Sequence, residues 1–203
     1  MLRSAKDRLA ELSTKRGDGA RAVYLYEQVT SLYRAAKEQF RNVEVVGSEY
    51  LGHEFEPGTY RGELRHEDAL GLSFESERFD LVISNDVYEH VPDIRLALRE
   101  ACRILRPGGA LLATFPFWFG PETQVRARLS QGVVEHLSPP EFHGNPISEK
   151  GSLVFYVFGW DVLGMCKEAG FSVAKFSCTH SYFNGYLGDE LGLRLYAEKP
   201  ARP

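Results

Sequence analysis

Four polar residues follow four predicted strands, and together they could line a ligand site. They are Glu27, Glu49, Asp68 and Asn85, and roughly one strand with its connection separates each from the next. Because the carboxyl ends of parallel strands meet at one edge of a sheet, we expect these side chains to lie along one rim. An acid after the second strand can accept hydrogen bonds from both hydroxyls of a ribose, and Glu49 has that place. The rim is therefore a candidate site for a nucleoside-like ligand.

Residues beside these four could complete the contacts to such a ligand. Tyr50 could stack on an adenine face, and Asp68 could accept from the adenine amino group. The backbone N–H of Ala69 could donate to the adjacent ring nitrogen, and backbone groups of Ser84 and Asn85 could hold an amino-acid portion. Taken singly, an acid after a strand is more often a helix cap or a solvated turn. The prediction therefore depends on the whole set rather than on any one residue.

A second group of reactive side chains lies in the proline-rich segment 116–158. Histidine titrates near neutral pH, so His136 or His143 could act as a general base, and His90 at a predicted helix start is a third candidate. These histidines could equally serve only to fix the loop by hydrogen bonds. A rival metal site would consist of Glu135, His136, Glu141 and His143. Because the spacing of that set matches no established metal motif, we predict no metal.

Composition limits the kinds of partner. With 203 residues, 43% hydrophobic and 26% charged, the chain suits one globular domain. The net charge of −4 argues against nucleic acid, since phosphate binding normally needs a basic surface. No apolar run approaches the ~20 residues of a membrane span, and the N-terminus lacks the apolar region of a secretion signal. The three cysteines, Cys102, Cys166 and Cys178, fit buried thiols in a reducing compartment. We therefore expect a cytoplasmic protein with neither a membrane nor a nucleic-acid partner.

Hydrophobic periodicity predicts strands and helices in alternation. This order implies an α/β fold with a mostly parallel sheet, right-handed crossovers and helices on both faces. We expect residues 1–203 to form a single domain, with an N-terminal helix and link over 1–20 and an inserted, loop-rich segment over 116–158. The predicted strands cover 22–26, 43–47, 64–67, 79–84, 110–115, 171–178 and 191–198. The predicted helices cover 2–14, 28–40, 93–106 and 160–169.

The most specific pattern follows the third predicted strand. Asp68 precedes Phe79-Asp80, an apolar strand, Glu89-His90 at a helix start, and the turn Pro107-Gly108-Gly109. This order resembles class I S-adenosylmethionine (SAM) methyltransferases of the type 11 kind, and a weaker resemblance extends over residues 22–199. The resemblance implies a Rossmann-like sheet of seven strands, with the last strand antiparallel, and SAM as the cofactor. The cofactor site would then consist of Glu27, Gln28, Glu49, Tyr50, Asp68, Ala69 and Asn85.

The chain departs from this family in the loop after the first strand. The family has a Gly-x-Gly-x-Gly loop there, because a Cβ would keep the backbone away from the cofactor. This chain has no glycine from Tyr26 to Ser31. In one interpretation the loop is rebuilt, and Glu27 and Gln28 contact the cofactor through their side chains. In another the site has closed and the domain is an inactive binding or scaffold module. A third is that a different nucleotide-like ligand uses the rim.

The leading hypothesis is a SAM-dependent methyltransferase that acts on a small or medium-sized polar molecule. His136, His143 or His90 would serve the acceptor. Relatives with this layout often belong to cell-surface saccharide pathways, so the resemblance makes a sugar-related acceptor a reasonable guess. We expect a small-molecule acceptor as the partner, and the sequence leaves a homodimer open.

Overall fold

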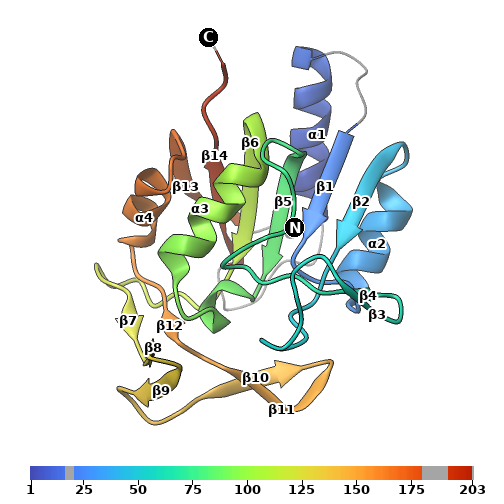
Figure 1. The fold of residues 1–203 in the computed structure, drawn as a ribbon. Helices are drawn as coiled ribbons and strands as arrows, with labels where there is room; N and C mark the ends of the chain where they lie inside the picture. Colours follow the sequence, from blue (N-terminus) through green and yellow to red (C-terminus); the bar gives the residue numbers. More distant parts are fainter. Residues whose placement is uncertain (17–20, 180–191, 203) are drawn as a thin grey trace.

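The computed structural model describes residues 1–16, 21–179 and 192–202. Within these residues six strands form one sheet, in the order β2-β1-β5-β6-β14-β13 (Figure 1). Its strands are β1 (Arg21–Leu25), β2 (Val43–Gly47), β5 (Phe79–Asn85), β6 (Leu105–Thr114), β13 (Val173–Thr179) and β14 (Gly192–Glu198). The helices are α1 (Leu2–Arg16), α2 (Ser31–Gln39), the short 3-10 helix η1 (Tyr88–His90), α3 (Ile94–Ile104) and α4 (Val162–Glu168).

The strand directions confirm the predicted fold class. β1 runs parallel to β2 and β5, and β5 runs parallel to β6. β14 is antiparallel to both of its neighbours, β6 and β13, so the last strand is reversed as predicted. Since β14 lies one place in from the edge, β13 and β2 form the two edges of the sheet.

The described sheet has six strands where seven were expected, because the predicted third strand is nearly lost. Residues 64–67 were expected to form the third strand. Instead β4 (Leu64–Arg65) turns back on β3 (Tyr60–Arg61) as a small hairpin. Only a parallel bridge between Glu49 and His66 remains at the position of the missing strand. Gly62, at the tip of the hairpin, has a φ of +62°, which a glycine adopts without strain.

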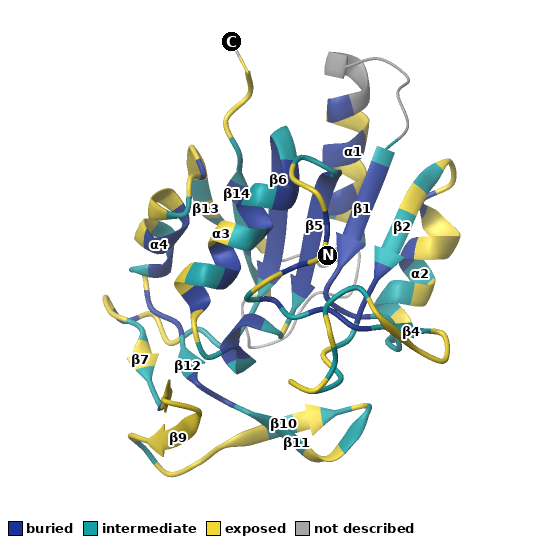
Figure 2. Cartoon of the chain, in the orientation of Figure 1, coloured by how far each residue is buried: buried dark blue, intermediate teal, exposed yellow. Residues whose placement is uncertain are grey.

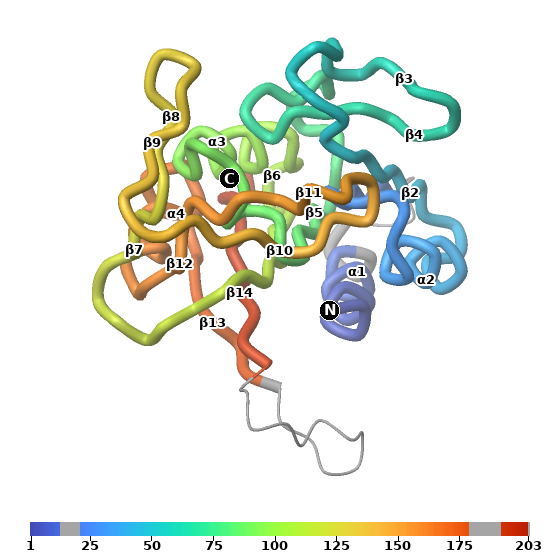
Figure 3. Tube along the Cα trace, turned by 90° about the horizontal axis from the view of Figure 1, so that it is seen from below, coloured from blue at the N-terminus to red at the C-terminus, as the bar shows by residue number. Residues whose placement is uncertain are grey.

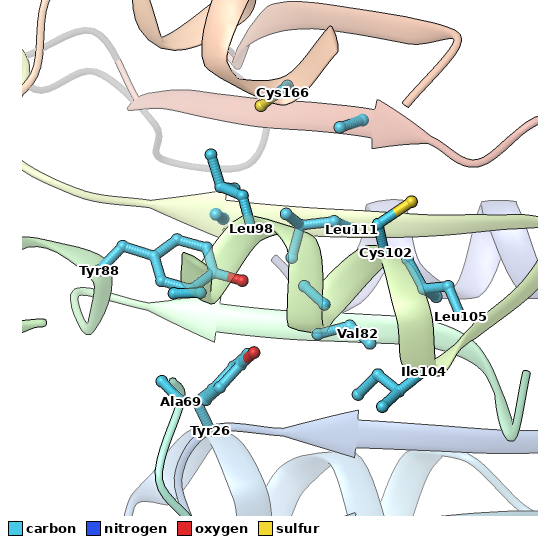
Figure 4. Close-up of a cluster of buried hydrophobic side chains, with 14 of the residues drawn as sticks. Tyr26, Ala69, Val82, Tyr88, Leu98, Cys102, Ile104, Leu105, Leu111 and Cys166 are labelled. Atoms are coloured by element: carbon cyan, nitrogen blue, oxygen red, sulfur yellow. The ribbon is translucent and has the colours of Figure 1, made fainter. Parts of the chain in front are cut away.

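The helices form two layers, one on each face of the sheet. α3 and α4 pack on one face, where Val82 of β5 and Leu111 of β6 meet Leu98 of α3 (Figure 4). α1 and α2 pack on the other face, against a cluster that includes Leu81 and Ile83. The central strands are therefore buried on both sides (Figure 2), as apolar parallel strands should be. Among the helices of the described residues, none is both long and apolar enough to span a membrane.

Local capping explains where α3 begins, and a strand explains where it ends. The side chain of Asp93 accepts a hydrogen bond from the backbone N–H of Leu96 and so caps the first turn. The helix ends at Ile104, two residues earlier than predicted. The predicted turn 107–109 is instead the first part of β6, where the pairing with β5 shifts register. Two of the three cysteines are buried as expected, whereas Cys178 is exposed.

The inserted segment 116–158, which is described throughout, contains strands that the prediction of a loop missed. Its prolines flank these strands, and residues 131 and 132 both have positive φ in the tight turn of one hairpin, as a two-residue β-turn requires. The hairpin β10–β11 lies beneath the carboxyl ends of the sheet in both views (Figures 1 and 3). The pairs are β7 (Gln124–Val125) with β12 (Tyr156–Val157), β8 (Ala127–Ser130) with β9 (Val133–His136), and β10 (Phe142–Asn145) with β11 (Ser148–Leu153).

One buried carboxylate joins the starts of three strands. Asp80 of β5 accepts from the backbone N–H of Ala22 at 3.0 Å and from Nη1 of Arg106 at 2.6 Å. We expect Asp80→Ala to lower the free energy of unfolding by about 2–4 kcal/mol, because it leaves the buried N–H of Ala22 without its acceptor and removes the ion pair with Arg106. Denaturant unfolding measures this. The control Glu44→Ala removes an exposed ion pair with Arg78 and should cost about 0.5 kcal/mol or less. Equal losses in the two variants would contradict the prediction.

Candidate active site

The candidate site lies at the carboxyl ends of β1, β2 and β5. The chain runs from β1 to β2 on one side and then crosses to β5 on the other side, so β1 is the topological switch point of the sheet. Ligands of open α/β sheets bind at such a point, outside the carboxyl ends of the strands. The residues that follow β1, β2 and β5 are therefore the ones that can contact a ligand together.

Glu27 follows β1 at this switch point and is buried. Its side-chain atom Oε1 has no hydrogen-bond partner among the described residues. The pKa of Glu27 is raised to about 7, mainly by burial and in part by the negative charges of Glu49 and Asp86, while a hydrogen bond with Thr30 opposes the shift. The rim is thus rich in negative charge, and among the described residues no cation compensates Glu27. A positively charged ligand group would fit this position.

Glu49 follows β2 and holds the loop after β1. Its Oε1 accepts the backbone N–H groups of Gln28 at 2.7 Å and Val29 at 2.9 Å. The other oxygen, Oε2, accepts no hydrogen bond from the described residues. Glu49 therefore has a structural task that the sequence did not suggest, and one oxygen remains for a ligand hydroxyl.

The structure places the other predicted cofactor residues along the same rim. Tyr50 is half exposed, with its ring centroid 5.5 Å from that of His66. Asp68 closes a tight turn, since its Oδ1 accepts from the N–H of Leu70 at 2.8 Å. Ala69 is buried beside this turn. Asn85 ends β5, and its Oδ1 accepts from the hydroxyl of Thr114 on β6 at 3.0 Å.

A second cluster lies just beyond β5 and combines η1 with the inserted segment. Glu89 is completely buried, and neither of its carboxylate oxygens has a hydrogen-bond partner among the described residues. Burial raises its pKa to about 8, and the charge of Asp86 adds to the shift. His90 Nε2 lies 3.7 Å from Glu89 Oε1, and His143 Nδ1 lies 3.6 Å from the same oxygen. Burial lowers the pKa of His90.

Hydrogen bonds fix the inserted segment to η1. The backbone N–H of Phe155 donates to the carbonyl of Glu89 at 2.7 Å, and the hydroxyl of Tyr156 donates to the carbonyl of Pro92 at 2.8 Å. His90 Nδ1 lies 2.9 Å from the carbonyl oxygen of Leu153. These contacts bring β10 and β11, which are far away in sequence, to the end of β5.

The structure separates the histidines that the sequence grouped together. His143 and His90 meet, with ring centroids 5.0 Å apart. His136 is exposed on β9, opposite Ala127 of β8, and is not part of this cluster. The rival metal set with Glu135 does not assemble among the described residues. The sequence analysis did not include Glu89 among the candidate site residues. Its position directly before His90, shortly after β5, was the available signal.

Comparisons with known proteins identify the family. Residues 8–113, slightly more than half of the chain, match the family model of the type 11 methyltransferase domain. The chain belongs to the class I methyltransferases. This confirms the resemblance read from Asp68 to Gly109, and the cofactor of this class is SAM.

Individual relatives of this methyltransferase are distant. An uncharacterized methyltransferase of Mycobacterium sp. (strain KMS) is 27% identical over 162 residues, which cover 74% of this chain and 64% of the relative. The matched region thus spans less than two thirds of the curated relative's length. A solved SAM-dependent methyltransferase from Mesorhizobium loti has a TM-score of 0.54 at 16% identity and covers 94% of this chain and 96% of its own. At that identity the likeness shows the fold alone.

The loop after β1 packs closely against a glycine at the end of β2. A Cβ on Gly47, at the end of β2, would lie 2.5 Å from the ring of Tyr33 and 2.6 Å from the carbonyl oxygen of Glu27. The side chain of Gln28 points towards the β3–β4 hairpin, where it donates to the carbonyl of Glu63 at 2.7 Å and accepts from the N–H of Arg65 at 3.0 Å. The loop after β1 is therefore fixed to both β2 and the β3–β4 hairpin.

Replacing Gly47 should disturb this loop. We expect Gly47→Ala to lower the free energy of unfolding by about 1–3 kcal/mol, because the added methyl group collides with the backbone of Glu27 and the ring of Tyr33. The matched control is Gly71→Ala, where a Cβ meets open space. That control should change stability by about 0.5 kcal/mol or less in the same denaturant experiment. Equal effects would show that the loop does not need a glycine at the end of β2.

The buried carboxyl of Glu27 predicts a pH-dependent stability. Its pKa in the folded chain, about 7, lies above the ordinary 4.5, so the native state loses stability as the pH rises from 4.5 through 7. Without ligand, Glu27→Gln should therefore be more stable than the natural chain at pH 8.5, by at most about 3 kcal/mol. The advantage should shrink towards pH 4.5. Thermal unfolding at both pH values tests this, with the exposed Glu63→Gln as the control that gains nothing.

Proposed function

We propose that this methyltransferase transfers the methyl group of SAM to a small or medium-sized polar acceptor. The observation that carries the proposal is the buried carboxyl of Glu27 at the switch point, with Glu49 and Asp86 close by and no cation beside it. SAM is positively charged at its sulfonium and at its ammonium group. The negative rim therefore complements the cofactor of the class in charge and in position.

The residues present fit a SAM molecule at this rim. Oε2 of Glu49 would accept from the ribose hydroxyls while Oε1 keeps the loop in place. Asp68 and Ala69 would meet the adenine edge, and the half-exposed ring of Tyr50 would stack on its face. Asn85 and the loop backbone after Glu27 would hold the methionine portion. Gln28 would contribute only its backbone carbonyl, because its N–H donates to Glu49 and its side chain bonds to the β3–β4 hairpin.

The inserted segment would serve the acceptor. When bound, the cofactor supplies an electrophilic methyl group on sulfur. The hairpin β10–β11 lies beneath the carboxyl ends of the strands, so it would cover a ligand there and exclude water (Figure 3). His143, placed between Glu89 and Glu141, is the best-positioned of the predicted bases to remove the acceptor proton. The position of His136 gives no support to its predicted catalytic role.

The names of two relatives support a small polar acceptor without identifying it. A sarcosine/dimethylglycine N-methyltransferase of Halorhodospira halochloris is 36% identical over 82 residues, or 39% of this chain. A structurally similar phosphoethanolamine N-methyltransferase 2 of Haemonchus contortus, solved with phosphomonomethylethanolamine and S-adenosylhomocysteine, has a TM-score of 0.52 at 17% identity and covers 96% of this chain and 52% of its own. Both names describe small polar acceptors. Among other classes of acceptor, we would test saccharides first.

One observation favours the inactive binding module as a second candidate. Glu49 and Gln28 use hydrogen-bonding groups to fix a loop that has no glycine, and a loop so fixed could leave too little room for SAM. Cofactor binding separates the two functions. An inactive domain with a closed rim would bind neither SAM nor S-adenosylhomocysteine.

Isothermal titration calorimetry tests the proposal. We expect SAM to bind more tightly at pH 8 than at pH 6, by up to about tenfold, because Glu27 must lose its proton to face the cation. Glu27→Gln should remove this pH dependence and reduce the preference for SAM over the uncharged sulfide of S-adenosylhomocysteine. Asp68→Ala should weaken both ligands by about 1–3 kcal/mol.

The control for these titrations is Glu63→Ala, which removes an exposed carboxylate from the β3–β4 hairpin and should leave binding unchanged. Absence of heat and of thermal stabilisation at millimolar ligand would overturn the proposal, since a bound ligand must stabilise the folded chain by mass action. Normal binding in both Asp68→Ala and Glu27→Gln would show that the cofactor lies elsewhere.

A further inference from the structure

Three side chains that can each offer an electron pair converge at the end of β5. They are the carboxylate of Glu89, the ring of His90 and the ring of His143, and one ligand atom from each lies within 4.8 Å of the others. Within the described residues, no other set of histidine, cysteine or acidic side chains gathers in this way. Glu89 is completely buried and both of its oxygens lack a hydrogen-bond partner among these residues. A buried carboxylate in that state is costly unless a positive charge joins it.

The outer nitrogen of each ring has an acceptor behind it. His90 Nδ1 lies 2.9 Å from the carbonyl oxygen of Leu153, so a proton on Nδ1 leaves the lone pair of Nε2 directed toward Glu89. His143 Nε2 lies 3.4 Å from Oε1 of Glu141, and this leaves the lone pair of Nδ1 on the same side as Glu89. Metal-binding histidines are held in this manner by a carbonyl or a carboxylate on the far nitrogen.

We propose that Glu89, His90 and His143 bind a divalent transition-metal cation, with Leu153 and Glu141 orienting the two rings. The proposal depends on the geometry of the three side chains and not on methyl transfer. A His143 that binds the cation through Nδ1 would no longer serve as the general base, so the two roles of His143 are alternatives. It differs from the set considered from the sequence, since Glu135 and His136 take no part and Glu141 acts behind His143.

The distances suit such a cation. Glu89 Oε1 is 3.7 Å from His90 Nε2 and 3.6 Å from His143 Nδ1. Bonds of about 2.0–2.2 Å to nitrogen and oxygen would place tetrahedral ligand atoms roughly 3.4 Å apart, so a small closing movement is enough. Two imidazoles with one carboxylate favour zinc, iron(II) or cobalt(II) over magnesium or calcium, which prefer oxygen ligands.

Three protein ligands leave at least one coordination position open. Metal sites with an open position bind water or a substrate oxygen there and lower the pKa of the bound group. The acceptor would then be a molecule with a hydroxyl or carboxylate oxygen that can coordinate the cation. This last step rests on the proposed function, whereas cation binding can be measured without it.

The experiment uses the full chain without a histidine tag, freed of metal with a chelator and dialysed. Titration calorimetry with Zn²⁺ and visible absorption with Co²⁺ measure binding to the natural chain and to its variants. We expect one equivalent of cation per chain and a visible Co²⁺ spectrum typical of nitrogen and oxygen ligands. Glu89→Gln and His143→Ala should weaken Zn²⁺ by well over tenfold, and Glu141→Ala by about tenfold because it removes only the support behind His143. His136→Ala, which removes an exposed histidine of the same segment, is the matched control and should bind normally.

Thermal unfolding provides the second measurement. Zn²⁺ should raise the melting temperature of the natural chain but not that of Glu89→Gln. The unfolding curve of Glu89→Gln without metal checks that this variant is folded. The proposal is wrong if the natural chain binds no stoichiometric Zn²⁺ or Co²⁺, or if Glu89→Gln and His143→Ala bind as the natural chain does. Zn²⁺ binding without SAM binding would refute only the proposed function. SAM binding without Zn²⁺ binding would refute only the metal site.

Discussion

Burying a carboxylate oxygen without a hydrogen-bond donor is unfavourable, and within the described residues two acids at the same edge of the sheet do so. Glu27 follows β1 and Glu89 follows β5, and both have buried oxygens without partners among the described residues. Burial raises both pKa values, and the negative charges of neighbouring acids add to the shift. Sites of this kind gather where a ligand supplies the missing charge. The two functional proposals both follow from this constraint, one with a cationic cofactor and the other with a metal ion.

The rest of the molecule is built to keep these two acids in place. β1 and β5 are buried between two helical layers, so the residues that follow them have little freedom to move towards water. Asp80 fixes the opposite ends of the same strands through Ala22 and Arg106. The inserted segment then closes over the carboxyl ends because Phe155 bonds directly to the backbone of Glu89. Rigid strands and a bonded cover together allow the burial of charge that an exposed loop would solvate.

The loop after β1 shows how a family feature can be replaced. Glycines in that loop would let its backbone approach the cofactor. Here the loop has none, and the close backbone contact is between Gly47 at the end of β2 and the carbonyl of Glu27. Glu49 supplies an acceptor to the amides of Gln28 and Val29, which orders the loop without glycines. Gln28 in turn replaces part of the missing third strand through its two side-chain bonds to the β3–β4 hairpin. The changes at Glu49 and Gln28 are linked, because each side chain supplies to the same loop hydrogen bonds that a ligand or a third strand could otherwise use.

Periodicity in the sequence was enough to predict the α/β class and the positions of β2, β5 and α3, because these depend on local spacing of apolar residues. The reversed last strand was predicted only from the family resemblance. The same spacing placed Glu27 and Glu49 at one rim, since parallel strands end at one edge. Only the tertiary structure decided that His143 rather than His136 joins His90, and that Glu89 is the acid between them. It also decided that Glu49 holds the loop. These contacts depend on how a distant hairpin packs against a strand end, and residue spacing along the chain contains no information about that packing.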